Sequence, residues 1–233
     1  MKKHIPNIIT SFNLLSGIMA IYFSFFGQLQ LAAALMALGA FFDFFDGLAA
    51  RALNVKSEMG KQMDSLADMV SFGLVPGFIM FQLMQKSESL PNMMIGGLVV
   101  LPFLAFIIPV LSAFRLAKFN IDTRQTDSFI GLPTPALALF VGSLPFLIDG
   151  VFSMQLLWLN NYYILLVLSF ALSMLLVSEL PLFSLKFKNL KWKDNAIRFV
   201  FLGLSILFLA LLQLGAFPVI IILYVFLSLL SKK

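Results

Sequence analysis

The sequence contains no cysteine and only one histidine in 233 residues. Disulfide bonds, thiolate metal sites and cysteine nucleophiles are therefore excluded, and neither a histidine-based zinc site nor a Ser-His-Asp triad is expected. Charged residues are also scarce, since they make up 12% of the chain, whereas a soluble domain has about 25%. Any acid–base or metal chemistry must therefore depend on a few carboxylates.

Apolar residues, in contrast, make up 61% of the chain, against about 45–50% in a soluble domain. Because about 20 apolar residues cross a bilayer as a helix, the chain has room for about eight such helices and for no separate soluble catalytic domain. We therefore predict an all-α, polytopic integral membrane bundle. The apolar runs place its eight transmembrane helices at 8–26, 30–52, 63–85, 93–117, 133–149, 162–183, 197–214 and 216–231.

Lysine and arginine indicate how this bundle is oriented. If the N-terminus is cytoplasmic, every one of the 16 cations except Lys86 falls in an inner segment. This bias follows the positive-inside rule and predicts that both termini are cytoplasmic. The net charge of +5 is scattered singly between apolar runs, so we expect no nucleic-acid partner. A basic segment separates a six-span core, residues 1–183, from a cytoplasmic loop and two-span hairpin, residues 184–233.

Four of the 11 acidic residues lie near the inner ends of the second and third spans: Asp43, Asp46, Asp64 and Asp68. At 100° per residue, each pair shares one stripe of its helix with very small residues. The two helices are consecutive and should be antiparallel neighbours, so the four carboxylates are predicted to converge near the cytoplasmic membrane boundary.

Such a cluster needs a compensating cation. One unpaired charge at the bilayer centre costs at least ~2.5–3.5 kcal/mol on insertion scales, and four like charges also repel one another. Oxygen ligands without histidine or cysteine suit Mg²⁺ or Mn²⁺, and four carboxylates could hold two such ions. A pair of divalent ions is a recurrent arrangement for displacement at phosphorus.

The segment 43–68 has a regular pattern: D-x-x-D-G-x-x-A-R, eight residues, G, three residues, D, three residues, D. This pattern resembles the signature of the CDP-alcohol phosphotransferases. The resemblance implies a magnesium- or manganese-dependent transfer from a CDP-linked donor to an alcohol, with release of CMP. It also implies that Asp43, Asp46 and Asp64 are metal ligands and that Asp68 is both a ligand and the general base. The residues implied to line the nucleotide are Gly47, Ala50, Arg51 and Gly60.

Two later segments narrow the range of possible acceptor alcohols. SAFRLAKFN, 112–120, and FIGLPTPALA, 129–138, are similar to segments of the membrane-embedded phosphatidylserine synthases of this family. This similarity implies CDP-diacylglycerol as donor, L-serine as acceptor, a homodimer, and a location in the cytoplasmic membrane of a prokaryote. We expect Arg115, Lys118 and Asn120, at the inner end of the fourth span, to bind the acceptor or the donor phosphates.

Polar residues of the first span have two interpretations. Asn7, Thr10 and Asn13 follow one another at intervals of three residues and form a polar stripe. They could contact the nucleotide, which is the role we assign to Asn7 and Thr10, or they could form hydrogen bonds between helices.

Three alternative functions stay open from the sequence. Another member of the family could use glycerol 3-phosphate or an inositol phosphate as acceptor. A cation- or proton-coupled transporter would also place acids in membrane helices, although on several helices near mid-bilayer. A lipid-binding scaffold without activity would tolerate the loss of Asp68.

Overall fold

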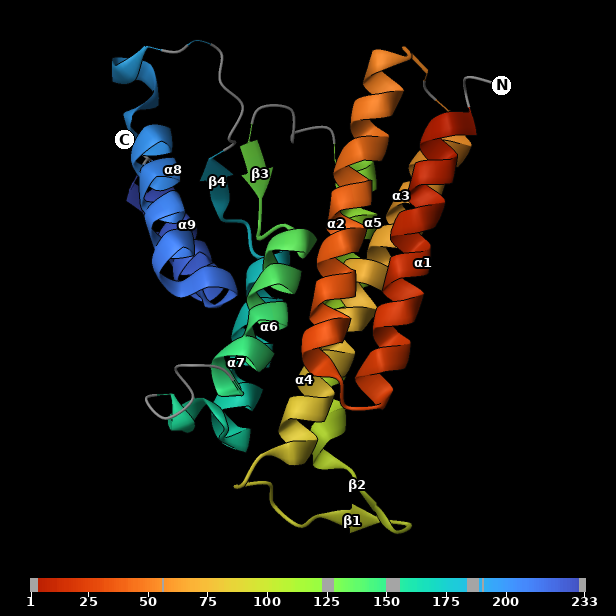
Figure 1. The fold of residues 1–233 in the computed structure, drawn as a ribbon, viewed down its shortest axis with the longest axis vertical. Helices are drawn as coiled ribbons and strands as arrows, with labels where there is room; N and C mark the ends of the chain where they lie inside the picture. The colour runs from red at the N-terminus through yellow and green to blue at the C-terminus, as the bar shows by residue number, and fades with distance from the viewer. Residues whose placement is uncertain are drawn as a thin grey trace.

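The computed structural model describes residues 4–55, 57–122, 128–149, 156–183, 189 and 191–230. Most of them lie in helices that run roughly along one axis (Figure 1). The longer helices are α1 (Ile5–Phe25), α2 (Leu29–Ala52), α3 (Glu58–Asp68), α4 (Val75–Lys86), α5 (Ile107–Ile121), α6 (Thr134–Ile148), α7 (Tyr162–Val177), α8 (Trp192–Leu212) and α9 (Phe217–Leu230).

Several of these helices are long and apolar enough to cross a membrane. Within the described residues, five segments meet both conditions: Ile5–Phe25, Leu29–Ala52, Glu58–Lys86, Leu101–Ile121 and Asp194–Leu230. The apolar helices α6 and α7 are shorter. The predicted class, an all-α polytopic membrane protein, is thus confirmed, while the number of eight crossings stays a prediction.

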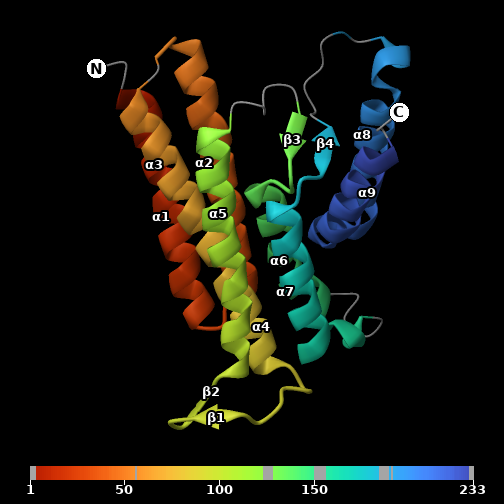
Figure 2. The ribbon, with the colours of Figure 1, turned by 180° about the vertical axis from the view of Figure 1, so that it is seen from behind.

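The helix that follows the α2–α3 connection changes its winding in the middle. α3 passes into a π-helical segment, Met69–Leu74, which continues into α4. Seen from behind (Figure 2), these pieces form one rod that lies between α1 and α5. Ser57 caps its start, because the Ser57 hydroxyl accepts a hydrogen bond from the Gly60 amide at 2.9 Å. A single π turn inside a helix is often found at a functional site, and this one begins directly after Asp68.

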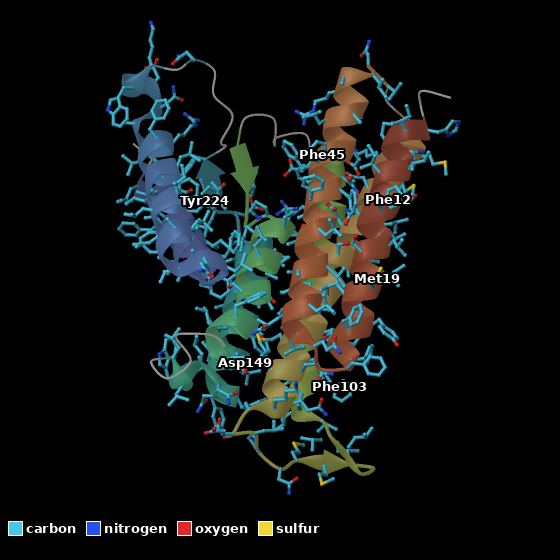
Figure 3. The ribbon with its side chains drawn as sticks, viewed as in Figure 1. Phe12, Met19, Phe45, Phe103, Asp149 and Tyr224 are labelled. Atoms are coloured by element: carbon cyan, nitrogen blue, oxygen red, sulfur yellow. The ribbon has the colours of Figure 1, made fainter. Side chains whose placement is uncertain are left out.

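The first helix has its polar side facing inward. Thr10, Asn13 and Ser24 are buried, whereas Phe12 and Met19 are exposed on the outer side of the bundle (Figure 3). Because lipid tails are apolar, membrane helices carry small and polar residues at helix contacts and large apolar residues outside. The pattern in α1 therefore fits a lipid-exposed helix whose polar stripe serves the protein interior.

Two predicted spans are shorter in the structure than in the sequence analysis. The fourth was expected from residue 93, but strands β1 (Met94–Ile95) and β2 (Leu98–Val99) form an antiparallel hairpin there. Its turn glycines, Gly96 and Gly97, have positive φ angles of 58° and 81°, as tight hairpins require. A 3₁₀ segment, Leu101–Phe106, then leads into α5.

The sixth span was expected to reach residue 183, but α7 ends at Val177. Strand β4 (Pro181–Phe183) instead pairs antiparallel with β3 (Ser128–Ile130), with Ile130 opposite Pro181. A short apolar run does not distinguish a strand from the continuation of an apolar helix, so hydropathy extended both helices too far.

The C-terminal hairpin lies to one side of the bundle (Figure 1). α8 and α9 are joined by a 3₁₀ segment, Gln213–Ala216, and contact α6 and β4. At the turn, a Cβ on Gly215 would lie 2.6 Å from Leu147. Tyr224, labelled in Figure 3, donates a hydrogen bond to the Phe183 carbonyl at 2.8 Å. The predicted basic loop falls mainly on residues 184–188 and 190, which lie outside the described residues, so the predicted domain division stays a prediction.

Candidate active site

Three of the four predicted carboxylates meet at one point. Asp43 of α2 and Asp64 and Asp68 of α3 each offer an oxygen, and these oxygens lie within 4.8 Å of one another. Asp64 and Asp68 share a helix face because they are one turn apart. Close packing of α1 against both α2 and α3 holds that face toward Asp43. All three side chains are partly buried, at the end of the bundle where α2 and α3 are connected.

The fourth carboxylate, Asp46, borders this cluster. It is only 6% exposed, and one of its oxygens accepts a hydrogen bond from the Thr10 hydroxyl at 2.7 Å. It also interacts electrostatically with both Asp43 and Asp64. Asp46 therefore connects the three-carboxylate cluster to α1.

A pocket of about 490 Å³ opens beside Asp46 and Asp64, within the size range of about 300–1,000 Å³ usual for ligand sites. It lies between the ends of α1, α2 and α3. Five of the six residues predicted to bind the nucleotide line this pocket. All of its lining residues are Pro6, Asn7, Thr10, Asp46, Gly47, Ala50, Val55, Ser57, Glu58, Gly60, Lys61 and Asp64. The pocket and the carboxylate cluster are thus continuous.

The two glycines in the pocket lining have different surroundings. A Cβ on Gly60 would lie 2.8 Å from the Ser57 hydroxyl and 3.1 Å from the Asn7 side-chain oxygen, so packing alone accounts for this glycine. A Cβ on Gly47 would meet nothing closer than Arg51, at 4.0 Å. Gly47 therefore keeps space open in the pocket rather than relieving a protein contact.

Arg51, the sixth predicted nucleotide residue, lies at the edge of the pocket. Its Nε donates a hydrogen bond to the Gly47 carbonyl at 2.9 Å, and the side chain is exposed. This bond fixes the guanidinium one helical turn from Gly47, where it can meet an anionic ligand.

The predicted acceptor residues on α5 are placed differently from one another. Arg115 is 8% exposed and close enough to Asp68 for an electrostatic interaction. Its Nε donates to the Leu132 carbonyl at 3.1 Å, and its guanidinium lies over the Phe119 ring, 5.3 Å from the centroid. Arg115 is therefore a buried cation next to the acidic cluster.

Lys118 and Asn120 make bonds to other elements. Lys118 forms an ion pair with Glu179, which lies between α7 and β4. The side-chain amide of Asn120 donates to the Ser65 hydroxyl at 2.8 Å, and the backbone carbonyl of Asn120 accepts from Lys61 Nζ at 3.1 Å. Asn120 thus ties the end of α5 to α3, whereas Lys118 ties α5 to the segment after α7.

The backbone that supports Arg115 depends on Gly131, which sequence reasoning did not single out. Gly131 has a φ of +75°, and a Cβ there would lie 2.4 Å from the Leu176 carbonyl oxygen. Its amide donates to the Leu180 carbonyl, and the Leu132 amide donates to the Leu175 carbonyl. These contacts bring the Leu132 carbonyl to Arg115. In the sequence, the only feature that could have indicated this role is a lone glycine between two apolar residues.

The cluster fits a divalent cation by its donor chemistry. Carboxylate oxygens are hard ligands, which Mg²⁺, Mn²⁺ and Ca²⁺ prefer. Three of them within 4.8 Å would repel one another strongly in a partly buried site unless a cation or protons compensated. The site as a whole places a carboxylate cluster that could hold a cation, an exposed arginine and a pocket next to one another, an arrangement that could bind a metal ion together with an anionic ligand.

Comparison with known proteins identifies the family. A family model described as CDP-alcohol phosphatidyltransferase matches residues 3–175, so the chain belongs to the CDP-alcohol phosphatidyltransferase family. This result confirms the resemblance found in the sequence, and it makes the chain an integral membrane enzyme of that family. The family generally uses a divalent metal, which agrees with the carboxylate cluster.

Several curated relatives carry a more specific name. A Helicobacter pylori CDP-diacylglycerol–serine O-phosphatidyltransferase is 32% identical over 218 residues, which cover 89% of this chain and 83% of the relative. The Bacillus subtilis protein of the same name is 35% identical over 137 residues, covering 57% and 70%. An archaetidylserine synthase of Methanothermobacter thermautotrophicus is 32% identical over 152 residues, covering 64% and 60%. These relatives are prokaryotic.

Proposed function

We propose that this enzyme transfers the phosphatidyl group of CDP-diacylglycerol to the hydroxyl of L-serine, which yields phosphatidylserine and CMP. The observation that carries the proposal is the continuity of the pocket with the acidic cluster, because Asp64 belongs to both. A nucleotide in the pocket would present its diphosphate to the carboxylates. The names of the relatives support serine as the acceptor.

The pocket residues would hold the CDP part of the donor. Asn7 and Thr10 offer polar groups from α1, Gly47 and Ala50 leave room for the nucleotide to approach the backbone, and Gly60 lines the same pocket. Arg51 would meet a phosphate from the edge of the pocket. The acyl chains of the donor would stay in the membrane beside the bundle, which suits a site built from membrane helices.

Asp43, Asp46, Asp64 and Asp68 would together hold two divalent ions, either Mg²⁺ or Mn²⁺. When bound, such ions neutralise the charge of the diphosphate and stabilise the CMP leaving group. Four carboxylates, three of which bring oxygens within 4.8 Å of one another, offer enough oxygen ligands for two such ions.

Asp68 would act as the general base. In this reaction the serine hydroxyl oxygen attacks the phosphorus that bears diacylglycerol, its proton passes to the Asp68 carboxylate, and the bond from that phosphorus to the bridging oxygen breaks to release CMP. Arg115 lies close to Asp68 and would bind the serine carboxylate or a donor phosphate. Lys118 and Asn120 would line the same acceptor region from the end of α5.

The site would face the cytoplasm, and the protein would lie in the inner membrane of its prokaryotic host. Lys61 and Arg51 lie at the pocket end of the bundle, and the positive-inside rule places such cations in the cytoplasm. α1 begins and α9 ends toward that same end (Figure 1), which supports two cytoplasmic termini. We further propose a homodimer, which the mass of the detergent-solubilised protein would test.

One assay tests the proposed reaction. Purified protein with Mn²⁺ and CDP-diacylglycerol is given L-serine, glycerol 3-phosphate or an inositol phosphate, and both CMP and the lipid product are measured. We expect CMP and phosphatidylserine with L-serine alone. Turnover with glycerol 3-phosphate but not with serine would assign a different acceptor. Ion flux across sealed vesicles without any donor turnover would instead favour a transporter.

A further inference from the structure

Asp68 has a close neighbour in the polar stripe of the first helix, a residue to which the proposed function assigns no role. Asn13 of α1 is fully buried, and its Nδ2 donates a hydrogen bond to Asp68 Oδ1 at 3.4 Å. This distance is longer than the usual range of about 2.7–3.2 Å. Catalytic hydrogen bonds are commonly long before substrate binds and shorten in the reacting complex. The contact brings a neutral donor from α1 to the carboxylate of α3.

The backbone at Asn13 is held by the same rod that carries Asp68. The Ser71 hydroxyl, in the π segment, donates to the Asn13 carbonyl at 3.1 Å. This approach requires Gly17, because a Cβ there would lie 2.5 Å from the Ser71 oxygen. Asn13 is therefore linked twice to this rod, through its side chain to Asp68 and through its carbonyl to Ser71.

The orientation of the Asn13 amide is also constrained. Its Oδ1 is buried and has no hydrogen-bond partner among the described residues, and it points to Gly39 of α2, where a Cβ would lie 3.0 Å away. The Asn13 amide attracts Asp68 only when Nδ2 faces the carboxylate. If the amide were turned over, Asn13 Oδ1 would face a carboxylate oxygen and the two would repel each other. A buried acceptor without a partner destabilises the fold. An apolar residue would avoid that cost, so packing alone does not account for an asparagine here.

We infer that Asn13 is a positioning residue for the reaction, which acts by fixing the Asp68 carboxylate. Because the Asn13 amide donates its hydrogen bond to Asp68 Oδ1, Asp68 Oδ2 is held in one orientation toward the acceptor hydroxyl. This inference rests on the role of Asp68 in the proposed function. Asn13 itself touches neither substrate nor reacting atoms, and its effect is exerted entirely through Asp68.

Steady-state kinetics of four variants test this inference. We expect Asn13→Ala to lower kcat at least about tenfold, as the loss of a hydrogen bond to a charged group would, while KM for CDP-diacylglycerol changes less than about twofold. Asn13→Asp has nearly the same shape but lacks the amide donor, so it should lower kcat at least as much. In the Asp68→Asn background, adding Asn13→Ala should change kcat less than about twofold, since a residue that acts through Asp68 has no further effect once Asp68 is replaced.

Controls separate this role from a structural one. Ser24→Ala is the matched variant, because Ser24 is a fully buried polar residue of the same helix whose hydroxyl has no partner within the described residues; its kcat should be unchanged. If Asn13→Ala does not fold, as judged by thermal denaturation in detergent, Gly39→Ala displaces the same amide and should also lower kcat.

Three results would overturn the inference: wild-type kcat in Asn13→Asp, wild-type kcat in Asn13→Ala, or equal losses from Asn13→Ala with and without Asp68. Wild-type protein that turns over no acceptor would refute the proposed function instead, and this inference with it. Wild-type protein that makes phosphatidylserine, together with a neutral Asn13→Ala, would refute the Asn13 role alone.

Discussion

The rod formed by α3 and α4 and the C-terminal hairpin formed by α8 and α9 are both apolar enough to cross a membrane, yet they differ in burial. Over an apolar stretch of 18 residues in each, 61% of the residues are buried in the rod and 22% in the hairpin. The rod contacts α1, α2, α5, α6 and α7, whereas the hairpin contacts mainly α6 and β4. Charged residues within the membrane are thus concentrated where surrounding helices can enclose them.

The comparison indicates that burial by neighbouring helices, rather than hydropathy, distinguishes the region that carries the candidate active site from the more exposed hairpin. The hairpin side chains Ile206, Leu211 and Ile222 are each more than 60% exposed, which suits contact with lipid. Substitutions of the same kind in the two regions should therefore have very different effects on turnover.

The largest difference is expected for aspartate-to-asparagine substitutions. Asp68→Asn should lower the rate of CMP release by about 10²-fold or more, since that is the usual contribution of a positioned base, and it should leave the thermal unfolding midpoint nearly unchanged. Asp194→Asn, in the exposed start of α8, is the matched control and should keep wild-type turnover. Near-normal turnover in Asp68→Asn would remove this residue from the role of base.

The identity of the ion bound by the carboxylates should affect the rate of CMP release almost as strongly. Ca²⁺ should compete with Mn²⁺ in titration calorimetry yet support little CMP release, because its larger and more flexible coordination shell positions a diphosphate poorly. Asp43→Asn should weaken Mn²⁺ binding in the same experiment. Equal rates with Ca²⁺ and Mn²⁺, or unaltered Mn²⁺ binding in Asp43→Asn, would contradict a catalytic ion at this cluster.

Glycine substitutions should have effects of intermediate size, and these effects should appear in KM. Gly47→Leu should raise KM for CDP-diacylglycerol at least tenfold, because the added side chain would occupy pocket space that no protein atom fills. Gly203→Leu, in α8, also meets open space and should leave KM unchanged. Similar KM values for the two variants would show that the pocket is not the donor site.

The smallest effect is expected where the hairpin meets the strands. Tyr224→Phe removes the hydroxyl that donates to the Phe183 carbonyl, and it should lower the free energy of unfolding by about 1 kcal/mol, a typical value for one hydrogen bond. Turnover should stay at the wild-type level. A large loss of kcat would show that the hairpin supports the active site and would weaken the contrast between the two regions.

Much of the fold follows from hydropathy, and its errors share one cause. Apolar runs predicted the order and approximate position of the helices, but they extended the fourth span over the β1–β2 hairpin and the sixth over β4. Strands and membrane helices use the same apolar residues, so hydropathy does not define their ends. The π segment after Asp68 likewise has no signal in a hydropathy profile.

The candidate site was predicted in part, because spacing along a helix determines which residues share a face. The positions of Asp64 and Asp68 one turn apart, and of Gly47 next to Asp46, indicate a common site from the sequence alone. The same reasoning assigned no partner to Lys118, which the structure pairs with Glu179, a residue 61 positions away. It also left the role of Asn13 undecided between nucleotide contact and helix packing.

The sequence by itself determined the class of the protein, its membrane setting and its family, because composition and fixed spacing are local properties of the chain. Tertiary structure alone decided which carboxylates meet within 4.8 Å, that Asp46 bonds to Thr10, and that Asn13 reaches Asp68 from another helix. Those contacts depend on how closely helices approach one another. That approach is set at Gly17 and Gly39 by the absence of a side chain.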